Sequence, residues 1–335
     1  MSAEIPAGAM RFNSDSQKLE YWNGSAWFQI HTATPDLASA GDRQPGARAV
    51  FGAQGQSDTS IDYINIASTG NSVDFGVLSE GKRSAGTFSS AVRGVFGGGR
   101  DVSAPSFTAE VETVIISSTG NAVDFGDNLN TALRAPFGLS NSTRGIFGGG
   151  YTPTSLSLME YTTIDAQSNF QDFGDLQTAQ SYMNGCASSS RGLISSAGPS
   201  FERIDFVTIS TLGDSVTFGD LTSAKLDTTA VSNSTRALFA GGGSPVTSNI
   251  IEYVTISTLG DSTSFGDLVN GTGLQGMAGA ASPTRGVFAY GSPNPGDTNT
   301  IQYVTISTQG DAVDFGDMGQ TGFEASGFSN AHGGL

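Results

Sequence analysis

The chain has 335 residues, of which 46 are glycine, 21 are phenylalanine and only 14% are charged, which favours one large all-β domain over several small ones. Its net charge of −16, from 31 acidic and 15 basic residues, argues against a nucleic acid or an anionic membrane as partner. No stretch has the length of a membrane span or the basic start of a secretion signal, so we expect a soluble product of the cytoplasm without membrane insertion.

The first 35 residues differ from the rest and predict a small β-meander. Stretches 7–12, 18–22 and 26–30 read as strands, and the pair Asn23-Gly24 predicts a two-residue hairpin turn. Three short strands cannot bury the two tryptophans of the chain. We therefore predict an attachment segment at 1–35 that packs on the rest of the chain, on its own copies or on another protein. The residues expected to make this contact are Tyr21, Trp22, Trp27 and Phe28.

Residues 36–335 form a second predicted domain, which is built from repeats. An arginine followed by a small residue, an apolar pair and glycines recurs at steps of 45, 51, 47, 45 and 49 residues. Each unit continues with a run of β-branched and aromatic residues, such as 251–257, and a glycine turn that leads to a strand ending in Phe-Gly. The six arginines are Arg48, Arg93, Arg144, Arg191, Arg236 and Arg285.

The hairpin that ends in this phenylalanine has a constant length. Nine residues separate the isoleucine of one strand from the phenylalanine of the next in every unit, so we expect the phenylalanines to wedge between neighbouring units. The segment before the next arginine ends in small residues, as a strand near a crowded axis requires. Four strands in each of six units predict a six-bladed β-propeller. The phenylalanines are Phe75, Phe125, Phe173, Phe218, Phe265 and Phe315.

The first unit lacks room for its inner strand, and the C-terminus supplies one. Leu37 and Arg48 are 11 residues apart, whereas the equivalent Leu221 and Arg236 are 15 apart. Residues 323–332 match an inner strand in pattern. The sequence therefore predicts a ring that is closed by the C-terminal strand.

The repeat resembles the kelch motif over residues 48–335, in its arginine, apolar pair, glycines and tyrosine-containing strand. Phenylalanine replaces the outer-strand tryptophan of kelch in every unit, and the hairpin before it is slightly longer. The resemblance implies a kelch-like propeller but no particular function, because such propellers serve many roles.

The N-terminal segment and the phrasing of the repeats also resemble proteins of tailed bacteriophages. MRFNSDSQKLEYWNGSAWFQI is similar to N-terminal modules of structural and fibre proteins, and the phrases IEYVTISTLGD and NSTRGIFGGG resemble kelch-like virion proteins of phages of marine bacteria and cyanobacteria. This resemblance implies a non-enzymatic structural protein located in the virion, as a tail fibre, appendage or capsid decoration. It also implies a homo-oligomer in the particle that contacts other virion proteins through residues 1–35.

Catalytic and cofactor sites find little support in the residues. The two histidines, His31 and His332, lie outside the complete units, which argues against a Ser/His/Asp or Cys/His site and against a histidine metal cluster. The glycine runs lead into strands without the lysine and helix of a phosphate loop. Cys186 lies in a small-residue strand and is expected to be a buried thiol. We therefore expect no catalytic residue, no cofactor and no metal ligand.

Repeated charged residues have structural explanations. The six arginines resemble the arginine cluster of sialidases, but they occupy equivalent positions, so we expect them to bind turn carbonyls or carboxylates. Single aspartates recur beside the Phe-Gly pair, at 74 and 127 for example, and offer too few oxygens for calcium without help from loops.

Loop lengths vary on one face of the predicted ring. The loop after the glycines ranges from 15 residues between Phe51 and Ile66 to 20 between Phe96 and Ile116, whereas the opposite hairpins are constant. Variable loops on a rigid scaffold commonly carry recognition. We predict that segments 100–107, 151–156, 244–248 and 290–299 contact a host-surface glycan or protein, or another virion protein. The candidate binding residues are Arg100, Phe107, Tyr151, Tyr290 and Asn294. The alternative hypothesis is a lectin or carbohydrate-active enzyme that uses the open face, for which paired carboxylates facing the axis would be the discriminating feature.

Overall fold

The computed structural model describes residues 6, 8–13, 18–29, 48–55, 58–101, 106–196, 202–243, 246–269, 271, 273–293 and 295–335. The chain divides into two compact units, residues 1–44 and 45–335. The predicted domain boundary at 35/36, His31 and Asn294 lie outside the described residues. Every regular element in the described ranges is a strand, and none of these residues belongs to a helix able to span a membrane.

The smaller unit is a three-stranded antiparallel sheet of β1 (Met10–Asn13), β2 (Lys18–Trp22) and β3 (Trp27–Gln29), which agrees with the predicted meander. The predicted two-residue turn is wrong, because Trp22 pairs with Trp27 and leaves four residues between them. The Asn23 side chain accepts hydrogen bonds from the backbone N–H groups of Ser25 and Ala26, which stabilises this longer loop.

The two faces of this sheet differ. On one face the rings of Trp22 and Trp27 lie 5.5 Å apart, and the Arg11 guanidinium lies 4.2 Å above the Trp27 ring. The tryptophans are therefore partly covered within their own sheet. The pairing of Met10 with Tyr21 and of Tyr21 with Phe28 places these residues on the other face, where all three side chains are exposed.

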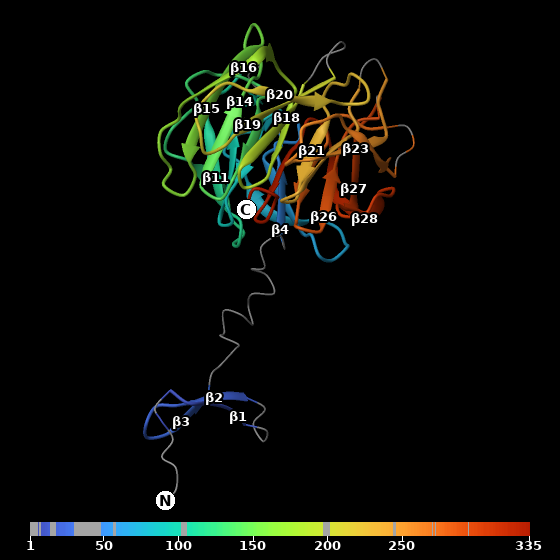
Figure 1. The fold of residues 1–335 in the computed structure, drawn as a ribbon. Coiled ribbons are helices and arrows are strands. Elements are labelled where there is room, and N and C mark those ends of the chain that lie inside the picture. The colour runs from blue at the N-terminus through green and yellow to red at the C-terminus, as the bar shows by residue number, and fades with distance from the viewer. Residues whose placement is uncertain are drawn as a thin grey trace, which may run out of the picture. The chain divides into compact units, whose positions relative to one another are not determined.

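The larger unit contains six four-stranded antiparallel sheets within the described residues (Figure 1). We number them by the chain order of their second strand. Sheet one comprises β29 (Ser326–Ser329), β4 (Arg48–Gly52), β5 (Ser60–Asn65) and β6 (Val73–Val77). Sheet two comprises β8 (Gly86–Ser89), β9 (Arg93–Gly97), β11 (Val111–Ile115) and β12 (Val123–Asp124). Sheet three comprises β13 (Phe137–Ser140), β14 (Arg144–Gly148), β15 (Leu156–Thr163) and β16 (Gln171–Gln180).

The remaining sheets repeat this order. Sheet four comprises β17 (Asn184–Ala187), β18 (Arg191–Ser195), β19 (Arg203–Thr208) and β20 (Val216–Asp220). Sheet five comprises β21 (Thr229–Ser232), β22 (Arg236–Ala240), β23 (Ile250–Thr255) and β24 (Thr263–Asp267). Sheet six comprises β25 (Ala278–Ala281), β26 (Arg285–Ala289), β27 (Thr298–Thr305) and β28 (Val313–Gly322). A short pair joins β7 (Lys82–Arg83) to β10 (Arg100–Asp101). This all-β architecture is consistent with a β-propeller.

The strand from the C-terminus completes sheet one. β29 pairs with β4 so that Phe328 lies opposite Val50, and Figure 1 shows the C-terminus beside β4.

The antiparallel register also separates two ends of every sheet. In sheet three, Phe137 lies opposite Gly148 and Leu156 opposite Gln180, so the glycine loops and the start of the first strand share one end. The constant hairpin turns lie at the other end.

The hydrophobic core lies between neighbouring sheets. Phe75 of sheet one is 2% exposed and packs with Phe96, Val114 and Ile116 of sheet two, as the wedge hypothesis predicts. All six predicted wedge phenylalanines are buried. In five sheets an aromatic ring of the third strand meets the phenylalanine edge to face, as Tyr63 does at 6.0 Å from Phe75.

Five of the six repeated arginines join sheets through their guanidinium groups. Arg144 donates from Nη1 to the Ile209 carbonyl oxygen of sheet four at 2.7 Å, and its guanidinium lies 4.4 Å above the Tyr161 ring. Equivalent bonds to the next sheet are made by Arg48, Arg191, Arg236 and Arg285. This structural role agrees with the prediction from their equivalent positions.

The glycine of the Phe-Gly pair has a steric role in every sheet except sheet two, where a Cβ atom on Gly126 would meet no neighbour within 4 Å. The turn of one hairpin docks on the outer strand of the preceding sheet, as where Gly120 N–H donates to Phe75 O at 2.7 Å. A Cβ atom on Gly76 would lie 2.3 Å from Gly120 O, and Gly76 has φ +155°. Only glycine therefore lets the two backbones approach. Sheet three has no glycine in its turn and docks instead through Gln167 Nε2, 2.7 Å from Phe125 O.

Candidate functional site

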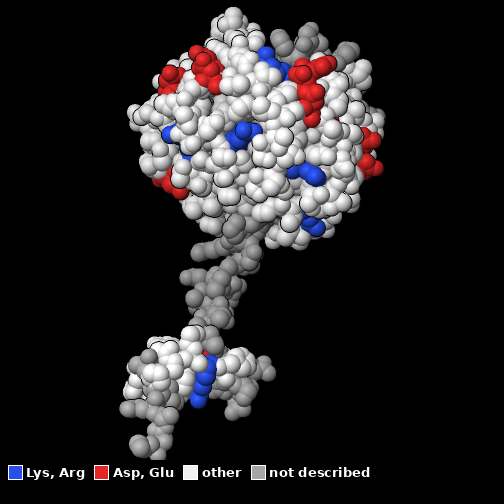
Figure 2. Space-filling model, viewed as in Figure 1, with Lys and Arg blue, Asp and Glu red and all other residues white. Residues whose placement is uncertain are grey.

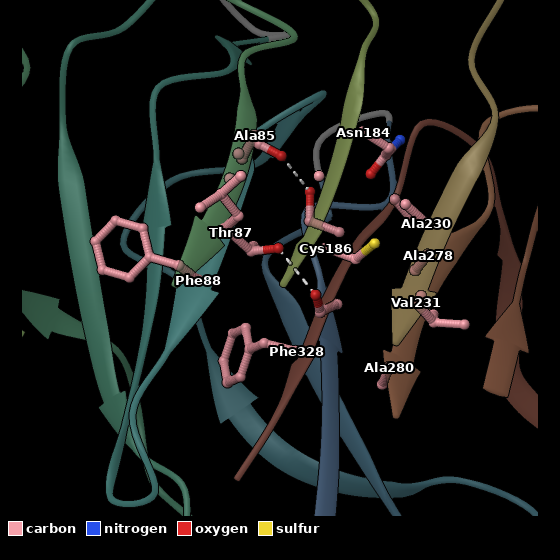
Figure 3. Close-up of a pocket in the computed structure, with 18 of the residues that line it drawn as sticks. Ala85, Thr87, Phe88, Asn184, Cys186, Ala230, Val231, Ala278, Ala280 and Phe328 are labelled. Carbon is pink, nitrogen blue, oxygen red and sulfur yellow. Dashed lines mark hydrogen bonds between the residues drawn. The ribbon is translucent and has the colours of Figure 1, made fainter. Parts of the chain in front are cut away.

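The first strands of all six sheets line one cavity of about 110 Å³. We call these strands the inner strands. Their small side chains, such as Cys186, Ala230, Ala278 and Ala280 in Figure 3, leave the space open. The rings of Phe88 and Phe328 pack instead on Phe147 and Phe96, between sheets. The small-residue inner strands predicted from the sequence therefore form a cavity wall.

Hydroxyl groups connect the inner strands around this cavity. Ser140 Oγ donates to Ser89 O at 2.8 Å, and Ser89 Oγ donates to Ser329 O at 2.7 Å. Ser329 donates in turn to Ala281 O, and Ser232 to Ala187 O. The acceptor is always the equivalent residue of the preceding sheet. A polar seam therefore fixes the inner strands relative to one another.

The C-terminal residues lie at one end of the cavity. His332 Nδ1 accepts the Gly334 N–H at 3.1 Å, so the neutral ring carries its proton on Nε2, which lies 3.1 Å from Ser89 O and donates to it. Burial lowers the pKa of His332 below its ordinary value. Gly333 N–H donates to Ser232 O at 2.9 Å. The tail thus bridges sheets two and five at this end of the cavity.

The opposite end is a mouth formed by one residue from each sheet. Each of these residues precedes its inner strand and has a left-handed backbone, with φ between 53° and 63°. Side chains other than glycine rarely adopt this conformation, so the mouth holds local strain of the kind that often accompanies binding sites. The six are Ser84, Ala135, Tyr182, Asp227, Gly276 and Glu324, and all line the cavity.

Two carboxyl groups stand at this mouth. Glu324 is held by Arg83, whose Nε lies 3.3 Å from Oε2, and by the Ser84 hydroxyl, which donates to the same oxygen. Burial and then the Glu324 charge raise the pKa of Asp227 to about 7. Asp227 therefore acts as hydrogen-bond donor or acceptor near neutral pH.

An arginine surrounded by aromatic rings lies beside the mouth. The Arg134 guanidinium carbon is 5.1 Å from the Tyr151 ring centre, 5.2 Å from that of Tyr182 and 5.8 Å from that of Phe107. Its Nε is buried without a hydrogen-bond partner among the described residues. The pKa of Tyr182 is raised by burial and next by Glu324, while Arg134 acts against this. We call Phe107, Arg134, Tyr151 and Tyr182 the aromatic-arginine cluster.

The structure brings some of the predicted binding residues together. Phe107 and Tyr151 meet edge to face at 5.8 Å, and Arg100 bridges to Phe107 through the backbone. Tyr290 is fully buried, so its prediction as a contact residue is wrong. Its ring fills space beside Gly322. In segment 244–248 the described Val246 is 74% exposed.

Sequence reasoning missed Arg134, Tyr182, Asp227 and Glu324. They occupy the connecting segments, where the repeat has no shared residue type. Tyr182, Asp227 and Glu324 share only a left-handed backbone, and Arg134 directly precedes Ala135, which has the same backbone. Paired carboxylates are the feature that would favour a lectin or carbohydrate-active enzyme, but sequence reasoning did not identify Asp227 and Glu324. The remaining expectation for this region, a buried thiol at Cys186, is confirmed, and burial raises its pKa to about 12.

Charged side chains are sparse on the face of the larger unit shown in Figure 2. Acidic groups gather near its rim and basic ones form isolated spots. Within the described ranges, no group of three or more His, Cys, Asp or Glu side chains is arranged to hold a metal ion. Hydrogen-bonding and aromatic groups are therefore the main recognition chemistry that the mouth offers.

No protein-family model matches the chain, and no curated protein matches it.

Proposed function

We propose that the six sheets are the blades of a closed six-bladed, kelch-like β-propeller. The contacts between sheets six and one support this, because they repeat those between other neighbours. Arg285 Nη1 lies 2.9 Å from Ile66 O, and Gly70 N–H donates to Phe315 O at 2.8 Å. The pairing of β29 with β4 then fastens the ring with the C-terminal strand.

We propose that this propeller is a non-enzymatic structural component of a bacteriophage particle, carried by its N-terminal unit and displayed for contact with a surface. The exposed face of that unit supports the attachment role. Met10 is 59% exposed, Phe12 66% and Phe28 47%, an apolar surface that a partner would cover. The partner is another virion protein or further copies of this chain.

The observation that carries the contact role is the aromatic-arginine cluster at the mouth. Its members come from separate loops but are anchored by short backbone bridges, as between Arg134 and Tyr151, whose N–H and C=O groups bond each other at 2.8 and 3.0 Å. A guanidinium with an open donor binds hydroxyl or carboxylate oxygens, and aromatic rings pack on the apolar faces of sugars. We propose a host-surface glycan as the partner of this face.

Binding to a panel of purified bacterial surface polysaccharides tests the contact role. Arg134→Ala should weaken binding at least tenfold, since it removes the only cation of the cluster. Leu259→Ala, an exposed residue in a constant turn at the opposite end of sheet five, is the matched control and should bind normally. Equal binding by Arg134→Ala, or no binding to any polysaccharide, would argue against this role.

Particle assembly tests the attachment role. A chain of residues 45–335 corresponds to one compact unit and should fold but not be incorporated. Mass spectrometry of purified particles measures incorporation, and the full chain is the reference. Normal incorporation of the shortened chain would contradict the proposal.

A carbohydrate-active enzyme is the second candidate, because Asp227 and Glu324 place two carboxyl groups at the axis. A pair of carboxyl groups flanking the scissile bond performs glycoside hydrolysis. New reducing ends after incubation with the same polysaccharides, lost in Asp227→Asn and in Glu324→Gln, would favour this candidate over a purely structural role.

A further inference from the structure

The third strand of every sheet carries a polar residue at one equivalent position, and all six are buried or nearly so. Burial of a carboxylate is unfavourable unless a cation or hydrogen-bond donors compensate it. The position therefore requires a partner wherever it is acidic. The six residues are Asp62, Glu112, Glu160, Asp205, Glu252 and Gln302.

Five sheets supply the compensation themselves. In sheet two the Lys82 ammonium lies 2.5 Å from Glu112 Oε2, and both side chains are 1% exposed. In sheet six the residue is a neutral glutamine. The other partners are Lys225 for Glu252, Arg203 for Asp205 and the Asn130 amide for Glu160. The repeat thus places a cation or an amide beside each buried acid except one.

Asp62 of sheet one is that exception. It lies directly opposite Asp74 on the paired strand, and like charges in this arrangement repel. Burial raises the pKa of Asp62, and the charges of Asp74 and Asp58 raise it further. Only the hydrogen bond from the Ser72 hydroxyl lowers this pKa. No basic residue is among the groups that shift the pKa of Asp62.

The lysine of sheets two and five has a glycine as its counterpart here. Lys82 and Lys225 stand two positions before Ser84 and Asp227 of the cavity mouth. The equivalent residue before Glu324 is Gly322. A Cβ atom there would lie 2.8 Å from Gln54 Cβ and 2.8 Å from Tyr290 Cδ1. These two uncharged side chains therefore occupy the space that a side chain at position 322 would take.

Both side chains leave an oxygen without a partner. Gln54 is 3% exposed and Tyr290 is fully buried, yet Gln54 Oε1 and Tyr290 Oη have no hydrogen-bond partner among the described residues. Gln54 Nε2 donates to Asp58 Oδ2 at 3.0 Å, which places the amide at this acidic cluster. Burial, and next the charges of Asp62 and Asp58, raise the pKa of the Tyr290 hydroxyl. Asp58 itself is satisfied, because its carboxylate also accepts from Ser60 and Gln320.

We propose that a divalent cation of the calcium type binds at this seam between sheets six and one, with the Asp62 carboxylate and Gln54 Oε1 as protein ligands. Such cations prefer oxygen ligands and keep waters where the protein offers few. Asp58 and Asp74 supply further negative charge, and a water bound to the ion donates to the Tyr290 hydroxyl oxygen. The ion takes the place that the Lys82 ammonium holds in sheet two. With two protein ligands, binding in the range of roughly 10⁻⁴–10⁻³ M is expected.

Thermal unfolding of the full chain after EDTA treatment tests this proposal, with calcium chloride added to 10 mM against sodium chloride of equal ionic strength. Calcium should raise the Tm by roughly 2 °C or more. Asp62→Asn should abolish the shift and should raise the Tm in EDTA, because it removes the repulsion with Asp74. Sheet six carries the amide Gln302 at this position, so an amide is compatible with the fold.

Asp311→Asn is the matched control, because it makes the same charge change in an exposed turn where other repeats have Asn71 and Asn121. It should keep the calcium shift. Terbium gives a second readout, since Tyr290 beside the ion should sensitise its luminescence and Tyr290→Phe should reduce it. No shift with calcium, or an equal shift in Asp62→Asn, would overturn the proposal. A shift with magnesium alone would also overturn the calcium-type assignment.

Discussion

The guanidinium of Arg285 in sheet six donates from Nη1 to the main-chain oxygen of Ile66 in sheet one at 2.9 Å. The same bond joins Arg144 of sheet three to Ile209 of sheet four at 2.7 Å. The ends of the repeat array thus contact each other as its internal neighbours do. The proposed ring is completed by β29, the strand that follows sheet six and pairs with β4.

Deletion of residues 323–335 should open the proposed ring. It removes β29 and leaves the backbone groups of β4 unpaired along one edge, which favours association with other chains. We expect aggregation and a lower Tm, measured by size-exclusion chromatography with light scattering and by thermal unfolding. Deletion of residues 1–44 is the control and should leave a monodisperse protein. A monomer of unchanged Tm after the C-terminal deletion would contradict the role of β29.

Phe218→Ala should destabilise the larger unit by about 3–5 kcal/mol, because the ring is 3% exposed and packs against Phe239 and Ile256 of the next sheet. Urea denaturation measures the free energy of unfolding. Val216→Ala, on the same strand but 54% exposed, should change it by less than about 0.5 kcal/mol. A loss below about 1 kcal/mol for Phe218→Ala would show that neighbouring residues fill the space.

The repeat made the periodic part of this structure predictable. The arginine bond to the next sheet, the phenylalanine wedge and the pairing of β29 with β4 all follow from positions that recur or that are missing at one end of the array. Two local features of the hairpins escaped prediction. The loop at Asn23 lengthens because its side chain bonds two backbone N–H groups, and the turn of sheet three docks through Gln167 instead of a glycine.

The candidate site could not be predicted in the same way. The six residues of the mouth share a left-handed backbone before the inner strand, but the residue type differs in every sheet, from Gly276 to Glu324. A repeat search detects shared identity and overlooks such positions. Tyr290 shows the converse error, because a tyrosine in a loop of variable length reads as exposed although it is buried beside Gly322.

Asp227 should make stability fall as the pH rises. Its folded-state pKa is raised to about 7 by burial and by Glu324, from an ordinary value of 3.8. Between pH 4 and pH 7 the folded protein therefore keeps a proton on Asp227 that the unfolded chain has lost. The free energy of unfolding falls as the pH rises through this range. Asp227→Asn should be more stable than the wild type at pH 8, with a smaller difference at pH 4.

Urea denaturation at pH 4, 6 and 8 measures this dependence. Asp261→Asn provides a control for the charge change, because Asp261 lies in an exposed turn and other repeats carry asparagine at that position. A difference between Asp227→Asn and the wild type that does not grow with pH would show that the Asp227 carboxyl is solvated at the mouth.

Ala281→Ser should stabilise the inner strands. At the equivalent position Ser89, Ser140, Ser232 and Ser329 each donate to a carbonyl of the preceding sheet, whereas Ala187 and Ala281 interrupt the series. A hydroxyl at 281 should reach the carbonyl of Ser232, because the inner strands repeat the same spacing.

A hydrogen bond of this kind contributes about 0.5–1.5 kcal/mol when both groups are already buried, and Ala281 is fully buried. The free energy of unfolding in urea should rise by that amount in Ala281→Ser. Ala281→Val adds bulk without a donor and should lower it, since an extra methyl group in a filled site causes strain. Ser232→Ala should cost at least that amount, because Ser232 Oγ donates to Ala187 O and also accepts from the Ala187 N–H. If Ala281→Ser were no more stable than the wild type while Ser232→Ala lost stability, sheets five and six would be spaced differently from the other pairs along the inner strands.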